Sequence, residues 1–154
     1  MRTNDLFLKV LERLQGDINA EIGEHNERTG DVLPGIMDID VGYRDVLTGL
    51  RCYPTLLVME LSRDCSDAYF TTYSVNFCVA HHGDDIDELQ REGSALLDCL
   101  EDAVRRDHSL GGLVFDVRNM HLEIGVISGT YVAAMSADVV VDLGSRFGMG
   151  GSSD

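Results

Sequence analysis

The stretch DIDELQREGSALLDCLEDAVRR, residues 85–106, decides the fold of this chain. Its apolar residues recur at helical spacing, which predicts an amphipathic helix with one face turned to a core. Asp85 and Glu88 make a capping pair at its start, and two arginines suit the negative end of the helix dipole. The apolar stripe is formed by Ile86, Leu89, Leu96, Leu97, Leu100 and Val104, with Gly93 in the same line.

Upstream of this stretch, the sequence predicts a second helix and two strands. Residues 4–22 carry a wide apolar stripe that stops at Gly23, which predicts a helix docked on a sheet. Residues 56–61 are almost continuously apolar, and residues 69–81 alternate between two faces. The polar segment between these two runs predicts a hairpin.

Downstream, a glycine pair at residues 111–112 introduces a second group of strands. We expect these strands at 113–117, 120–127 and 131–143, with a bend at Asn119. The last segment is longer than a small sheet needs. Its first half is therefore expected to project as a hairpin with the end of the preceding strand.

Together these elements predict an α+β fold, with one mixed, mainly antiparallel sheet covered by two helices and a projecting loop or hairpin. A length of 154 residues fits a single domain, which we assign to residues 1–143. Residues 24–53 lose their periodicity and read as a long irregular loop, which is unusual inside a compact domain unless a neighbour holds it. Residues 144–154, rich in glycine and serine, read as a flexible tail.

The chain is strongly acidic, with 27 acidic against 12 basic side chains and a net charge of −15. This balance argues against a groove that binds nucleic-acid phosphates. Lys9 is the only lysine. A surface of Asp, Glu and Arg is typical of proteins from saturated-salt hosts, because salt screens their self-repulsion. A GC-rich genome would also exchange lysine for arginine, and both explanations stay open.

The sequence contains no nucleophile elbow, phosphate-binding loop or dinucleotide fingerprint. We therefore expect no enzyme activity, no catalytic residues and no cofactor. The best candidate for a metal site is the group His81, His82, Asp84 and Asp85, where a strand ends and the helix begins. Adjacent strand side chains point to opposite faces, so the two histidines are not expected to share an ion. The aspartates already have a role as helix caps.

Four segments, taken with the order of the predicted elements, point to a known family. They are Tyr53-Pro54-Thr55-Leu56-Leu57-Val58, Tyr73-Ser74-Val75-Asn76-Phe77-Cys78-Val79, residues 84–106 and residues 131–143. In this order they resemble the tail terminator and related tail-completion proteins of long-tailed, siphovirus-like viruses, and the resemblance covers most of the chain. It implies a structural virion protein that forms a ring, hexameric in this family, at the head-proximal end of the tail tube, where it ends tail polymerisation and joins the tail to the head connector.

The resemblance also implies the partners and the location. The partners are other copies of the chain, the tail tube protein and the head-side connector protein. The location is the tail or neck of a virion assembled in the host cytoplasm. DNA would pass through the ring without specific binding, since an acidic ring repels phosphates. With a salt-loving host, the virus would be one of a haloarchaeon. No apolar run reaches the eighteen or so residues of a membrane span, so no membrane contact is expected.

Within the long loop, Tyr43, Arg44, Leu47 and Tyr53 are the residues expected at the contact between subunits. Tyrosine and arginine anchor protein interfaces out of proportion to their number. The alternative is that this loop folds over the edge of its own sheet.

Two other functions stay open. The first is another neck component, such as a head-completion or adaptor protein. The second, from a different class, is a small metal-binding enzyme centred on the His81, His82, Asp84 and Asp85 group.

Overall fold

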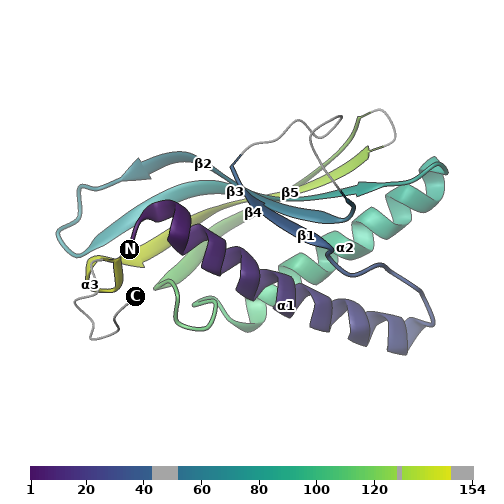
Figure 1. Cartoon of the computed structure of the whole chain (residues 1–154), viewed down its shortest axis with the longest axis horizontal. Helices are drawn as coiled ribbons and strands as arrows, with labels where there is room; N and C mark the ends of the chain where they lie inside the picture. Colours follow the sequence, from purple (N-terminus) through teal and green to yellow (C-terminus); the bar gives the residue numbers. More distant parts are fainter. Residues whose placement is uncertain (43–51, 128–129, 147–154) are drawn as a thin grey trace.

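The computed structural model describes residues 1–42, 52–127 and 130–146, and the statements below about structure concern this part of the chain. Figure 1 shows its elements in sequence colours. They are α1 (Thr3–Thr29), β1 (Asp38–Val41), β2 (Thr55–Asp64), β3 (Phe70–His82), α2 (Ile86–Arg106), β4 (Asp116–Ile127), β5 (Thr130–Asp142) and the short α3 (Leu143–Arg146).

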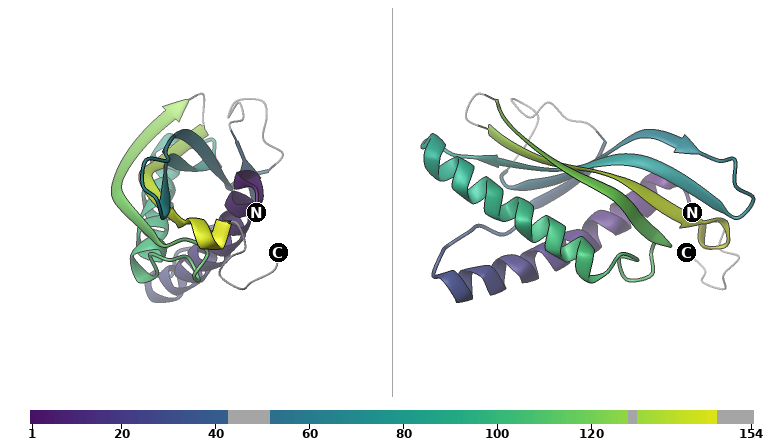
Figure 2. Two further views of the ribbon diagram at one scale, coloured as in Figure 1. Left: turned by 90° about the vertical axis from the view of Figure 1, so that its left-hand side faces the viewer. Right: turned by 180° about the vertical axis from the view of Figure 1, so that it is seen from behind.

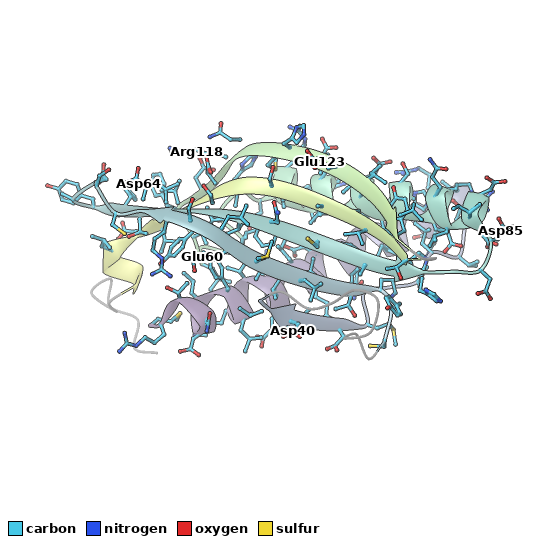
Figure 3. All side chains as sticks on the ribbon, turned by 90° about the horizontal axis from the view of Figure 1, so that it is seen from above. Asp40, Glu60, Asp64, Asp85, Arg118 and Glu123 are labelled. Carbon is cyan, nitrogen blue, oxygen red and sulfur yellow. The ribbon has the colours of Figure 1, made fainter. Side chains whose placement is uncertain are left out.

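The five strands form one mixed sheet in the order β1-β2-β3-β5-β4. β1 runs parallel to β2, and every other neighbouring pair is antiparallel. α1 and α2 pack on one face of the sheet, which we call the helix-covered face, and Figure 3 looks onto the opposite, open face. The predicted α+β fold, with two helices on one mainly antiparallel sheet, is confirmed.

α2 is the helix predicted from residues 85–106. The Asp85 side chain accepts hydrogen bonds from the backbone N–H groups of Asp87 at 3.0 Å and Glu88 at 3.3 Å, so it caps the helix as expected. Ile86, in the first turn, is 60% exposed and lies outside the core, contrary to the predicted stripe. The buried residues of α2 are Leu89, Gly93, Leu96, Leu97, Cys99, Leu100, Ala103 and Val104.

α1 is longer than predicted. Gly23 does not end it, because one glycine inside a helix costs only about 1 kcal/mol, which burial of the stripe on the sheet outweighs. The helix continues to Thr29 and ends at Gly30, whose φ of 78° is left-handed. Its buried residues are those predicted: Leu6, Phe7, Val10, Leu11, Leu14, Ile18 and Ile22.

Residues 24–53, predicted to be one irregular loop, contain regular structure at places the sequence did not indicate. Residues 24–29 belong to α1, and Asp38–Val41 form β1 beside β2. β1 was not predicted because its four residues offer too few positions for an alternation to be recognised. Residues 43–51 lie outside the described residues.

The second group of strands is simpler than predicted. Segments 113–117 and 120–127 are replaced by the single strand β4, whose register with β5 shifts between Arg118 and His121. Asn119, at the predicted bend, adopts a positive φ of 56° inside this irregularity. In Figures 1 and 2 the β2–β3 pair reaches beyond the start of α1 at one end of the molecule, and the paired ends of β4 and β5 rise away from the helices at the other.

The C-terminal segment begins differently from the predicted tail, because α3 spans Leu143–Arg146. Residues 147–154 lie outside the described residues. Among the described helices, none combines the length and the apolar character needed to cross a membrane.

Candidate functional site

The metal-site candidate lies where β3 ends and α2 begins. A pocket of about 190 Å³ forms there, lined by His81, His82, Gly83, Asp84, Asp85, Glu88, Leu89 and Glu92. The strand supplies the two histidines, and the first two turns of the helix supply the carboxylates. The sequence therefore identified the pocket, although not the geometry of its side chains.

His81 and His82 point to opposite faces of the sheet, as the alternation of a strand requires. His81 is buried, and its Nε2 lies 3.2 Å from Glu92 Oε2, whereas His81 Nδ1 has no hydrogen-bond partner among the described residues. His82 is exposed, and its ring lies 5.3 Å from the ring of Tyr53, measured between centroids. The two histidines are therefore not brought together.

The carboxylates of this pocket are not assembled around a cation either. Asp85 is occupied as the N-cap of α2, and Glu92 is occupied by His81. Within residues 1–42, 52–127 and 130–146, no three His, Cys, Asp or Glu side chains lie together as they would to hold a metal ion. What the arrangement does is fix the end of β3 against α2.

Glu92 is the residue of this pocket that the sequence argument missed. It lies four residues after Glu88, so helical spacing places both on the flank of α2 that follows the cap. That spacing is the signal that could have identified it as the partner of His81.

A second polar groove separates the C-terminal halves of α1 and α2, with Glu21, Glu24, Asp98, Cys99 and Asp102 among its lining residues. Arg106 spans it by ion pairs with Glu21 and Glu24. Burial raises the pKa of the Asp98 carboxyl, and the neighbouring Asp102 raises it further. Burial likewise raises the pKa of the Cys99 thiol to about 11, so this thiol stays protonated and is a poor nucleophile.

The residues predicted at the subunit contact divide into two groups. Tyr43, Arg44 and Leu47 lie outside the described residues. Tyr53 is described, half-buried, and in contact with the His82 ring at the end of the sheet.

The two edges of the sheet that pair with no further strand among the described residues are the surfaces best suited to contact a neighbour, because an edge strand offers unpaired backbone groups. One edge is β1, four residues long, and the other is β4, twelve residues long. Ile124 and Val126, near the end of β4, are 52% and 42% exposed. The alternation of residues 120–127 pointed to a strand, but gave no sign that it would be an edge.

The comparisons with known proteins leave the fold and these surfaces to carry the functional argument. No protein-family model matches the chain, and no curated protein matches it.

Proposed function

We propose that the chain is a structural virion protein that forms a ring, hexameric by the resemblance, at the head-proximal end of a viral tail tube. There it ends tail polymerisation and joins the tail to the head connector. The order of elements supports this role: a helix, a long connection, a hairpin, a second helix and a closing pair of strands, as the resemblance implies.

The observation that carries the proposal is the one-sided sheet, whose two edge strands pair with no further strand in the described part of the chain. α1 and α2 cover one face, and no described helix covers the other (Figure 3). A chain that repeats in a ring needs two different surfaces that fit each other, and opposite edges of one sheet supply them.

The open face is suited to a protein neighbour or a water-filled channel. Its centre carries small and polar side chains such as Ser74, Asn76 and Ser136, all half-buried. Asp138 accepts hydrogen bonds from Ser74 Oγ at 3.1 Å and Asn119 Nδ2 at 2.8 Å, so its carboxylate is part of an ordered polar surface. An acidic, polar ring lets DNA pass without holding its phosphates.

The partners in this proposal are further copies of the chain, the tail tube protein and the head-side connector. Labelling tests the location directly. Antibody against this chain, carrying gold particles, is expected to mark the junction of head and tail in purified virions viewed by electron microscopy. Label at the tail tip or along the capsid, or particles without label, would rule out the proposed position.

A further inference from the structure

The end of β4 presents apolar side chains that no described helix covers. The register with β5 sets Ile124 beside Ala133 and Val126 beside Tyr131, and both of these β5 residues are buried under the helices. α2, however, packs mainly on β5 and β3. Ile124 and Val126 therefore lie on the helix-covered face of an edge strand, yet remain half exposed. We call these two residues the β4 patch.

The opposite edge of the sheet has a matching apolar surface. Ile39 and Val41 of β1 lie half-buried against the core under α1. Met37 comes two residues before Ile39, so alternation places it on the same face, and it is 65% exposed. We call Met37, Ile39 and Val41 the β1 patch. Both patches thus lie on the helix-covered face, at opposite edges of one sheet.

Both edge strands carry charged side chains on the open face. β1 carries Asp38 and Asp40 on this face, since their register partners are Thr55 and Leu57. β4 carries Arg118, paired with Asp116 at 2.7 Å, and His121 beside Glu123 at 3.2 Å. A ring requires that unlike surfaces meet, and β1 and β4 are the two edge strands of the described sheet. Figure 3 shows Asp40 on one side of the sheet and Arg118 and Glu123 on the other.

An irregularity protects the first half of β4 against pairing with a further strand, whereas the second half has no such protection. The irregularity at Asn119 twists the strand near Arg118, as bulges on edge strands commonly do to discourage association. Beyond it the register with β5 is regular from His121 to Ile127. Glu123 is the single acidic side chain in that stretch.

We propose that the β4 patch of one copy receives the β1 patch of a second copy, edge to edge, and that repetition of this head-to-tail contact closes the ring. The inference rests on the ring proposed above and names the surfaces that build it. The contact continues the sheet from one subunit to the next, with apolar side chains meeting on the helix-covered face and charged ones on the open face.

Native mass spectrometry of three variants tests the contact. Val126→Glu places a charge in the β4 patch, and Met37→Glu places one in the β1 patch. Leu8→Glu is the matched control, because Leu8 is 42% exposed, like Val126, but belongs to α1 and to neither patch. The wild type and Leu8→Glu are expected to assemble at molar ammonium acetate, and the two edge variants are expected to stay monomeric with unchanged circular dichroism.

Mixing the two edge variants gives the decisive result. Each keeps one intact patch, so an equimolar mixture is expected to form a heterodimer and nothing larger. A Val126→Glu variant that assembles like the wild type would overturn the inference and leave the ring proposal standing. Assembly of Met37→Glu alone would show β4–β4 pairing and would also overturn it. A wild type that stays monomeric overturns the inference too, while the labelling of virions decides the tail function separately.

Discussion

Gly93 lets α2 lie directly on the Tyr131 ring at the start of β5. A Cβ atom at residue 93 would fall well inside contact distance of three carbon atoms of that ring. Tyr131 is fully buried and cannot move away without disturbing the core. The glycine that interrupts the apolar stripe in the sequence therefore permits a close approach between helix and sheet.

Gly93→Ala is expected to lower the free energy of unfolding by about 1–3 kcal/mol, the usual cost of overpacking a core. Gly16→Ala is the control, because residue 16 is exposed in α1 with no atom within 4 Å of the added Cβ. That change should stabilise the protein by up to about 1 kcal/mol through helix propensity. Urea denaturation of both variants measures the difference. Equal stability of the two would show that α2 does not approach Tyr131 this closely.

Asp107 makes the turn after α2 sensitive to pH. Hydrogen bonds from the Ser109 hydroxyl and the Gly111 N–H lower the pKa of its carboxyl. Because the pKa is lowered in the folded state, this stabilisation is full above the ordinary value of 3.8 and is lost as the pH falls through the folded value. The melting temperature of the wild type should exceed that of Asp107→Asn at pH 7, and the gap should close in acid. A gap that does not change with pH would contradict this role.

At the scale of elements, two asparagines of α1 hold the connection to β1. The Asn26 amide donates to Leu33 O at 3.0 Å and accepts from Leu33 N at 2.9 Å. The Asn19 amide accepts from Ile36 N at 2.6 Å and donates to Ile36 O at 3.3 Å. These side chains take the place of a neighbouring strand, which lets an extended segment run back along a helix with its backbone groups satisfied.

Asn26→Ala is expected to cost about 2 kcal/mol, since it removes two hydrogen bonds worth about 1 kcal/mol each. The loss should be local: hydrogen exchange at the Leu33 amide should accelerate, while amides of β3 stay protected. Asn4→Ala serves as the control, because no hydrogen bond of the Asn4 side chain joins α1 to this connection. Unchanged exchange at Leu33 would mean that the asparagine does not hold the segment.

Leu97→Asp tests the helix–sheet layer as a whole. Leu97 is 6% exposed in the core face of α2, so the variant buries a carboxylate without a partner. Such burial costs several kcal/mol against a total stability of about 5–15, and the domain is expected to unfold. A melting temperature within a few degrees of the parent would show that α2 does not bury this face.

The elements that the sequence predicted correctly are those whose apolar pattern repeats over many residues. The stripes of α1 and α2 and the alternation of β3 each repeat over many residues, and apart from Ile86 their burial on the sheet is as expected. β1 has four residues and no such repetition, and Gly23 looked like a stop although Gly30 is the residue with the left-handed conformation. The types of residue located the pocket at His81. The contact of His81 with Glu92 could not be predicted, because it depends on how β3 meets α2 in space.

At the scale of the whole molecule, the net charge of −15 opposes compaction. The melting temperature is expected to rise as salt increases from about 0.1 M to molar, because the Debye length shrinks from about 10 Å to about 3 Å. The exposed ion pairs lose some strength over the same range, but each contributes little. Scanning calorimetry in KCl measures the net effect of these two changes on the melting temperature. A flat or falling melting temperature would leave genome composition as the explanation of the missing lysines.

The proposed role of this chain is to end a viral tail and to join it to a head. The most direct measurement is an electron-microscopic count of tail lengths and joined particles, made in virus lacking this chain and again with the chain supplied in trans. The account predicts separate heads and tails of irregular length without the chain, and normal particles when it is restored. Joined particles with tails of normal length in its absence would contradict the account.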